Sequence, residues 1–345
     1  MPSTSTVDTV AIADAPPSLT ARLLNVRTLA SLIVAAIIVA VAVWRAPIDW
    51  GDAWNKIRNA SPLLYLVALL VYYFSFVVRS VRWSLLLRNS GENQPARSLV
   101  GIVITSFFVN CVVPAKMGDV YRAYLARIKL RISASHALGT IVAERLLDLC
   151  VLMGLLLAAG ALVFGTKQPK FLIPYVVVGI AICLVGVGVL LVMRAGRGQR
   201  LLRLLPEAVF QRYESFRIGT ITSFKRVPLL LFETTIVWAC EAARLGFVVA
   251  ALHVTVHLGP SQFVLVALVA ALLTTVPFLP GGLGLVEAGM IGVLIAVGGV
   301  DKQTAVSITL LDRSISYGSL VVIGFVVFLV THVKAPRRMA AAVGG

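Results

Sequence analysis

The sequence has few charged side chains, and this scarcity excludes a water-soluble fold. Asp, Glu, Lys and Arg make up 13% of the 345 residues, whereas hydrophobic residues make up 59% and the mean hydropathy is +0.94. A soluble chain of this length needs much more polar surface. Because a backbone that crosses lipid must satisfy its own hydrogen bonds, the composition predicts an all-α polytopic membrane protein.

Cysteines are also scarce, and their spacing indicates neither disulfides nor a metal site. The four of them stand singly in apolar segments, with no Cys-x-x-Cys pair. The four histidines lie at loop edges, without a third ligand nearby to complete a metal site. We therefore expect no bound metal, and small buried side chains at Cys111, Cys150, Cys183 and Cys240.

Catalytic motifs are missing as well. The sequence has no His-Glu-x-x-His, no Gly-x-Ser-x-Gly, no Walker loop and no Gly-x-Gly-x-x-Gly that opens a helix after a strand. We expect no enzyme activity, no cofactor and no coupling to ATP within this chain. The net charge of +16 does not predict a nucleic-acid partner, because the basic residues do not form one soluble domain with interleaved aromatics.

What the sequence does contain is long apolar runs. A helix that crosses a hydrocarbon core of about 30 Å needs roughly 20 apolar residues. Six runs meet this length, near residues 28–45, 62–87, 137–164, 172–194, 229–252 and 303–331. Two other apolar regions, about 98–113 and 262–298, are broken by Pro and Gly and are expected to be re-entrant segments. The first 27 residues are rich in Ser, Thr, Ala and Pro, which predicts a disordered tail.

The distribution of Lys and Arg predicts the orientation. With a cytoplasmic N-terminus, the outer loops hold five basic residues, whereas 21 of the 31 lie in the inward-facing segments, which are 1–27, 80–136, 195–228 with Arg194, and 332–345. This asymmetry follows the positive-inside rule. We expect a multi-pass protein of the plasma or inner membrane with both termini in the cytoplasm, in contact with anionic lipid of the inner leaflet.

Two breaks in the apolar runs are similar and predict an internal duplication. The sequences PAKMG at 114–118 and PGGLG at 280–284 each end an apolar run. An acidic-basic pair follows each break by about thirty residues, namely Glu144-Arg145 and Asp312-Arg313. Upstream, Arg79 and Arg82 precede the first break by about the distance at which Glu241 and Arg244 precede the second.

The predicted orientation makes these two repeats inverted. The chain then divides into a tail (1–27), a first helix with an outer loop (28–61), repeat A (62–171), a connecting helix with a basic cytoplasmic loop (172–228), repeat B (229–331) and a second tail (332–345). Folds of this kind bind substrate where the two halves meet, beside broken helices whose backbone groups are not satisfied internally.

Charged residues within the spans are the first candidates for a site. Such a charge costs at least about 2.5–3.5 kcal/mol at the bilayer centre and normally faces a cavity or a partner. Arg79 and Arg82 lie close to the inner interface, so snorkelling toward water is the alternative for them. For Arg145, Arg313 and Glu287 we expect a cavity-facing role, a salt bridge that joins the two halves, or both.

The breaks themselves are the second candidates. The helix that follows PGGLG offers unpaired N–H groups and a positive dipole end, which suit a phosphate or carboxylate. Glu287 can cap this helix, pair with an arginine of the opposite half or bind a proton, and a bare hinge without a ligand is the alternative. The counterparts in the first half are Asn110, Pro114, Gly118, Asp119 and Arg122.

These residues form four motifs that resemble a known family. The motifs are Arg79-x-x-Arg82-Trp83, Asn110-x-x-x-Pro114-x-x-x-Gly118-Asp119-x-x-Arg122, Glu144-Arg145-x-x-Asp148 and Pro277-x-x-Pro280-Gly281-Gly282-x-Gly284-x-x-Glu287. As a set they resemble the lysylphosphatidylglycerol synthase transmembrane-region family, also described as flippase-like integral membrane proteins, over about residues 25–335. The resemblance implies re-entrant helices and movement of phospholipid, aminoacylated phospholipid or polyprenyl-linked lipid between leaflets.

Some members of that family carry a soluble aminoacyl-transferase domain that makes the modified lipid. This sequence ends about fourteen residues after its last expected span, so we expect a stand-alone member without the synthase activity. The identity of the lipid does not transfer with the fold.

We therefore expect a lipid flippase, either energy-independent or ion-coupled, with anionic membrane lipids as partners and a lipid-biosynthesis enzyme as a further candidate partner. The headgroup is expected on Arg82, Arg145, Arg244 and Arg313, with Glu144, Asp312 and Glu287 as their counter-charges in the empty cavity. The alternatives are a small-solute or ion-coupled secondary transporter, a non-transporting scaffold for a lipid-modifying enzyme, and an intramembrane transferase that uses paired carboxylates as a general base.

Overall fold

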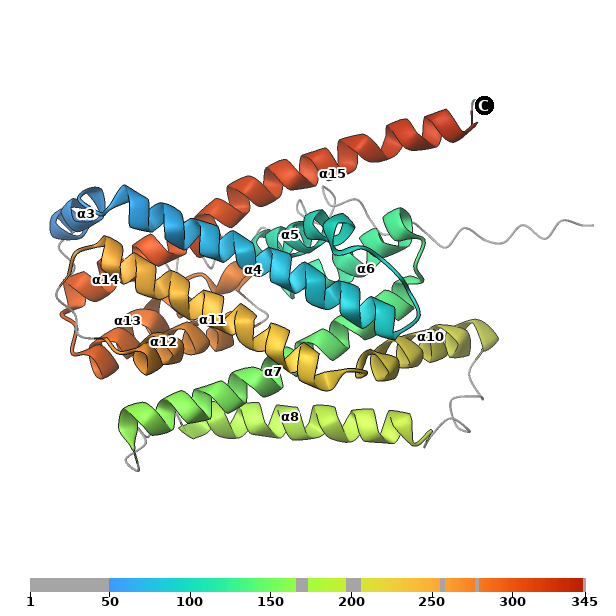
Figure 1. Ribbon diagram of the computed structural model, residues 1–345, viewed down its shortest axis with the longest axis horizontal. Helices are drawn as coiled ribbons and strands as arrows, with labels where there is room; N and C mark the ends of the chain where they lie inside the picture. The colour runs from blue at the N-terminus through green and yellow to red at the C-terminus, as the bar shows by residue number, and fades with distance from the viewer. Residues whose placement is uncertain (1–49, 166–172, 197–205, 255–257, 277–278, 344–345) are drawn as a thin grey trace, which may run out of the picture.

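The computed structural model describes residues 50–165, 173–196, 206–254, 258–276 and 279–343, and every regular element in these ranges is a helix (Figure 1). The chain is thus an all-α polytopic membrane protein. The expected N-terminal tail, the expected span at 28–45 and Pro277 lie outside the described residues.

Two series of helices with the same order make up most of the fold. The first consists of α4 (Pro62–Asn89), α5 (Ala96–Val112), α6 (Met117–Leu130) and α7 (Ala134–Phe164). The second consists of α11 (Val227–Ala251), α12 (Pro260–Leu273), the short η1 (Pro280–Gly282), α13 (Leu285–Gly298), α14 (Lys302–Arg313), the π-helical η2 (Ser314–Ser319) and α15 (Leu320–Val343). The remaining described helices are α3 (Trp50–Arg58), α8 (Ile173–Arg194) and α10 (Glu207–Ser223).

Six helical segments are long and apolar enough to cross a membrane, namely Pro62–Asn89, Ala134–Phe164, Val176–Arg194, Val227–Ala251, Pro280–Gly298 and Lys302–Thr331. Five of them coincide with expected spans. The segment Pro280–Gly298 falls instead in a region expected to be broken, and it does contain a break, because the backbone of Gly281 is non-helical.

The helices α4 and α11 lie side by side and run in opposite directions (Figure 1). At one end the N–H of Ser61 donates to the carbonyl of Ala251 at 2.7 Å. At the other end the Asn89 side chain donates to the carbonyls of Ser223 and Lys225 at 3.0 and 2.7 Å. Opposite directions are what an inverted repeat requires, and the duplication itself stays a prediction.

Each series contains a helical hairpin whose tip follows a proline. The proline lacks an N–H group and cannot continue the helix. The next two residues then adopt left-handed backbone angles, with φ of 63° and 50° at Ala115 and Lys116 and of 56° and 69° at Gly281 and Gly282. We call residues 113–116 the first tip and residues 279–284 the second tip.

The first hairpin depends on a glycine where its two arms touch. A Cβ atom on Gly118 of α6 would lie 2.0 Å from the carbonyl oxygen of Ser106 in α5. The second tip also lies close to the end of α5 that leads into the first tip, since a Cβ atom on Gly281 would lie 3.6 Å from the Cα of Cys111. The hairpins therefore meet inside the helix bundle.

The outer helices present apolar side chains to the surroundings. In α8, for example, Leu184 and Val185 are 68% and 66% exposed. By contrast, α4 buries Arg79, Arg82 and Trp83. An apolar exterior around buried charges is the reverse of a soluble protein and suits a lipid environment.

Candidate intramembrane binding site

A cavity of about 250 Å³ lies where the two hairpin tips meet. Helices of both series form its walls, including α4, α5, α7, α11, α12 and α14. Its charged lining residues are Arg79, Lys116, Asp119, Arg145, Asp148, Glu241, Arg244, Asp312 and Arg313. A concave site with convergent polar groups between two halves is the usual place for a ligand in such a protein.

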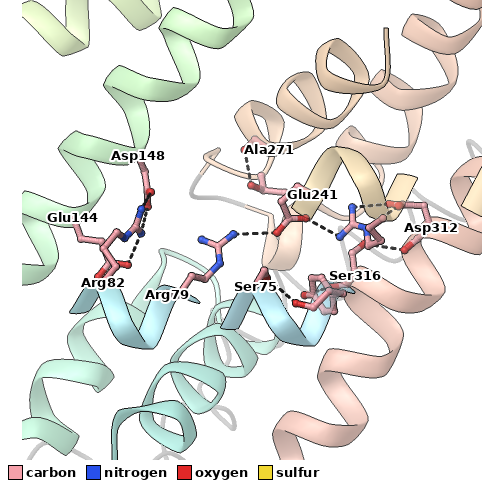
Figure 2. A network of polar contacts seen from close by, with 12 residues as sticks. Ser75, Arg79, Arg82, Glu144, Asp148, Glu241, Ala271, Asp312 and Ser316 are labelled. Carbon is pink, nitrogen blue, oxygen red and sulfur yellow. Dashed lines mark hydrogen bonds and ion pairs between the residues drawn. The ribbon is translucent and has the colours of Figure 1, made fainter. Parts of the chain in front are cut away.

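Arg82 stands at the centre of a buried cluster in the first half (Figure 2). Its guanidinium donates to Glu144 Oε1 at 2.9 Å, to Thr234 Oγ1 at 2.8 Å and to both carboxylate oxygens of Asp148. The side chains of Arg82 and Glu144 are 0% exposed. Because the carboxylates neutralise the guanidinium and accept its hydrogen bonds, the charge is tolerated without water.

Arg122 of α6 joins the same cluster. Its Nη2 lies 2.9 Å from Glu144 Oε2, and its guanidinium lies 3.8 Å from the centroid of the Trp83 ring. A cation on an indole face gains further stabilisation when it is desolvated. Neither Arg122 nor Glu144 lines the cavity, which favours a structural role for both.

The alternative of snorkelling is wrong for Arg79 and Arg82. These residues are 5% and 0% exposed, and both are held by carboxylates inside the bundle. Arg79 Nη2 donates to Glu241 Oε1 at 3.0 Å, and this ion pair joins α4 to α11 (Figure 2). A salt bridge between the two halves is therefore present, but it joins Arg79 to Glu241. The expectation of such a bridge at Arg145, Arg313 and Glu287 is wrong, because these residues pair within their own halves.

Arg145 is the most accessible arginine of the network, with 32% of its side chain exposed. It binds Asp119 of α6 through two parallel hydrogen bonds of 3.0 Å, and its Nη1 lies 3.3 Å from Asp148. The two-point contact fixes the orientation of the guanidinium. Arg145 thus lines the cavity with its hydrogen-bonding fork already engaged.

In the second half, Arg244 has the role that Arg82 has in the first. It donates to Asp312 at 2.9 and 3.1 Å and to Glu241 at 2.8 Å. Glu241 accepts from Arg79 as well, so the second cluster is continuous with the first half (Figure 2).

Arg313 completes the second cluster at the second tip. Its Nε donates to Glu287 Oε1 at 2.6 Å and its Nη2 donates to the carbonyl of Gly281 at 3.0 Å. The other Glu287 oxygen accepts the N–H of Gly284 at 2.6 Å. Glu287 therefore caps α13 as expected, but it pairs with an arginine of its own half, and the expected pairing with the opposite half is wrong.

The two halves repeat the same pattern of ion pairs. Arg145 and Asp119 are 26 residues apart in sequence, and so are Arg313 and Glu287. The preceding acidic residue in each motif, Glu144 or Asp312, binds an arginine of the first helix of its series. This shared pattern supports the predicted duplication.

The cavity brings together more than half of the expected site residues. Those in its lining are Arg79, Asn110, Pro114, Asp119, Arg145, Asp148, Glu241, Arg244, Gly281, Asp312 and Arg313. Those outside its lining are Arg82, Gly118, Arg122, Glu144, Pro280, Gly282, Gly284 and Glu287. A role of any of them in binding substrate stays a prediction.

Sequence reasoning missed several side chains of the lining, among them Lys116, Trp238 and Phe107. Lys116 belongs to the PAKMG break, so its position was the available signal. Trp238 precedes Glu241 by three residues on α11 and shares a face with it. Phe107 had no signal; it lies under Arg79 and Arg145, whose guanidinium carbons are 5.0 and 5.6 Å from its ring centroid.

The cysteines give a mixed result. Cys111 and Cys240 are buried as expected, whereas Cys150 and Cys183 are half-buried, and all four are free thiols. Within the described part of the chain, no group of three or more His, Cys, Asp or Glu is placed to hold a metal ion.

The fold and the cavity together define a polytopic helical membrane protein with a charged cavity between two helical hairpins. The chain belongs to the family described as the lysylphosphatidylglycerol synthase TM region, whose model matches residues 29–324.

Similar proteins share most of this length. A UPF0104 membrane protein of Methanocaldococcus jannaschii is 30% identical over 241 residues, which cover 67% of this chain and 98% of the relative. Another, of Methanothermobacter thermautotrophicus, is 23% identical over 311 residues, which cover 83% and 91% of the two chains. Glycosyltransferase AglD of Haloferax volcanii is 25% identical over 331 residues, 83% of this chain but 52% of that protein.

Proposed function

We propose that this chain is a flippase that moves an anionic or modified phospholipid, or a polyprenyl-linked lipid, between the leaflets of the cell membrane. The observation that carries the proposal is the cavity between the hairpin tips, whose lining holds five cationic side chains: Arg79, Lys116, Arg145, Arg244 and Arg313. Membership of the family supports the same conclusion.

The ion pairs suit a site that is alternately empty and filled. In the empty cavity each arginine is neutralised by a carboxylate, so no unpaired guanidinium has to be desolvated. A headgroup phosphate offers the same two-oxygen acceptor as a carboxylate and is able to exchange with Asp119 on the partly exposed Arg145. The acyl chains stay in the bilayer beside the apolar outer helices.

The test is leaflet exchange in vesicles that contain the purified chain. Phosphatidylglycerol and phosphatidylcholine with fluorescent headgroups are followed separately, with a membrane-impermeant quencher that reports the outer leaflet. We expect faster exchange of phosphatidylglycerol than in protein-free vesicles. Ala271→Phe, which fills part of the cavity lining, should slow it at least about tenfold, whereas Ala158→Phe on the exposed face of α7 should not change it.

A folded chain that gives no exchange, even with an imposed ion gradient, would refute the flippase. Uptake of a soluble anion into sealed vesicles would then indicate a secondary transporter. The name of the relative AglD makes a scaffold for a lipid-modifying enzyme the other candidate. That candidate predicts no exchange by any variant, together with loss of enzyme co-purification when the surface of the chain is altered.

A further inference from the structure

The cationic side chains that line the cavity differ in whether they form an ion pair with a carboxylate. The four arginines of the lining, Arg79, Arg145, Arg244 and Arg313, each form an ion pair with a carboxylate. Lys116 lines the same cavity, and its ammonium makes no ion pair or hydrogen bond with any described residue. Since separating a buried pair is strongly unfavourable, Lys116 can accept an anion without breaking an ion pair, although the carboxylates of Asp119 and Asp148 already act on it electrostatically.

The lining also has N–H groups that are short of acceptors. Trp238 Nε1 and Arg79 Nε are buried without a hydrogen-bond partner, on residues that are 9% and 5% exposed. In the described part of the chain, no buried side-chain acceptor atom of a lining residue lacks a partner. Asn110 accepts from Gly118 N–H through its oxygen, which leaves its NH₂ group as a further donor. Unpaired buried donors indicate a ligand rich in acceptor oxygens.

The backbone at the first tip gives independent support. Ala115 and Lys116 have φ of 63° and 50°, a region that side chains with a Cβ atom adopt at a cost, and the second tip uses glycine at both matching positions. Strained residues of this kind cluster at binding sites, where the strain holds a side chain in place. Glycine at position 116 would relieve the strain, whereas the lysine that stands there places its side chain in the lining of the cavity.

We propose that Lys116 binds the phosphate of the lipid headgroup alongside Arg145, with the N–H groups of Trp238 and Arg79 as further donors. This inference rests on the proposed flippase function and names its specificity-determining residue. A lysine ammonium is a compact point charge that suits phosphate. It also repels a headgroup that carries its own cation, so Lys116 favours anionic over zwitterionic lipid.

Binding of short-chain lipids to the detergent-purified chain tests the proposal apart from transport. Isothermal titration with dihexanoyl phosphatidylglycerol and dihexanoyl phosphatidylcholine gives both affinities. Lys116→Gln should weaken phosphatidylglycerol binding at least about tenfold and abolish the preference between the two, because a hydrogen bond to a charged group is lost. Lys116→Arg should keep most of the preference, and the exposed control Lys302→Gln should keep all of it.

A second variant separates binding from folding. Lys116→Gly removes the ammonium and also the backbone strain, so we expect it to lose the lipid preference while its thermal unfolding midpoint stays equal or rises. A lysine that served only the structure would lower the midpoint when replaced. Full lipid preference in folded Lys116→Gln or Lys116→Gly would overturn the assignment.

The vesicle assay distinguishes this failure from failure of the flippase itself. If the native chain exchanges phosphatidylglycerol and Lys116→Gln does so with unchanged preference, the flippase stands and Lys116 is excluded. Glycerol 1-phosphate identifies the source of the phosphate. If it binds as tightly as the short-chain lipid and accumulates in sealed vesicles, a soluble phosphate ester is the ligand and the lipid assignment is overturned.

Discussion

The two hairpin tips share one backbone course and differ in chemistry. Each follows a proline with two successive left-handed residues, which are glycines at 281 and 282 but Ala115 and Lys116 in the first half. The left-handed region costs a residue with a Cβ atom about 1–2 kcal/mol. The second tip is therefore built without strain, whereas the first tip retains strain and a cation.

The tips also differ in how the following helix is capped. At the second tip the carboxylate of Glu287 accepts the N–H of Gly284 at 2.6 Å, so an internal anion occupies the helix terminus. At the first tip the neutral amide of Asn110 accepts the N–H of Gly118 at 2.8 Å. The comparison teaches that two hairpins of similar course can differ in their caps, since one helix end is closed by a carboxylate of the chain and the other holds no internal anion.

The largest expected effect is a loss of stability when the central carboxylate of either half, Glu144 or Asp312, is neutralised. Glu144→Gln should destabilise the chain by about 3–5 kcal/mol, because it leaves the buried guanidinium of Arg122 without its carboxylate partner, while Arg82 keeps Asp148. Asp312→Asn, at the matching position, should cost less because Arg244 keeps Glu241. Thermal unfolding in detergent, followed by size-exclusion chromatography, measures both. An equal or greater loss for Asp312→Asn would contradict the comparison.

The next effect concerns close packing below the first tip. Gly118→Ala should destabilise by about 3 kcal/mol, since the new Cβ atom would lie 2.0 Å from the backbone oxygen of Ser106 and neither helix can move away freely. Gly292→Ala on α13 is the matched control, because nothing lies within 4 Å of the Cβ atom there. Helix propensity predicts a neutral or slightly stabilising control. Similar losses for both variants would show that the contact is not the cause.

A third prediction concerns the glycine of the second tip. Gly281→Ala should cost about 2 kcal/mol, because φ is 56° and the added Cβ atom would lie 2.6 Å from Cε2 of Tyr317. Combining it with Tyr317→Leu should recover part of the loss, so the double variant should be more stable than the sum of the single effects predicts. Strict additivity in the thermal unfolding measurements would exclude the ring contact as a cause.

The smallest effect has the opposite sign. Ala115→Gly should stabilise the chain by about 1 kcal/mol, since it relieves the left-handed strain and the exposed Ala115 side chain has little packing to lose. The same substitution at the exposed helical position Ala158 should destabilise by about 1 kcal/mol. Comparison of the two unfolding midpoints is the measurement, and a loss at position 115 would show that the first tip is not strained.

Much of the fold was predictable because its signals are local. Apolar length located α4, α7, α8 and α11 to within a few residues, and the prolines at 114 and 280 located both breaks. The continuation of α15 to Val343, beyond the expected end of the last span, was not predicted. Hydropathy locates the apolar part of a helix, and it does not indicate where a polar continuation of that helix ends. The end of α15 was missed for this reason.

The partners of the charges were less predictable. Glu144 and Arg145 are adjacent in sequence and were expected as an acidic-basic pair. In the structure Glu144 binds Arg82 and Arg122, whereas Arg145 binds Asp119. Neighbours on a helix point about 100° apart, so each meets a different helix. Which helix lies on each side is a property of the packing.

The sequence by itself therefore determined that this chain is a helical membrane protein with two similar breaks and charged residues beside them, because apolar length and proline act through the local backbone. Only the tertiary structure decided which charges pair with one another, which residues line the cavity and that Lys116 stands there without an ion-pair partner among the described residues. Ion pairing and cavity lining depend on contacts between helices that are far apart in the chain, and sequence spacing alone does not specify these contacts.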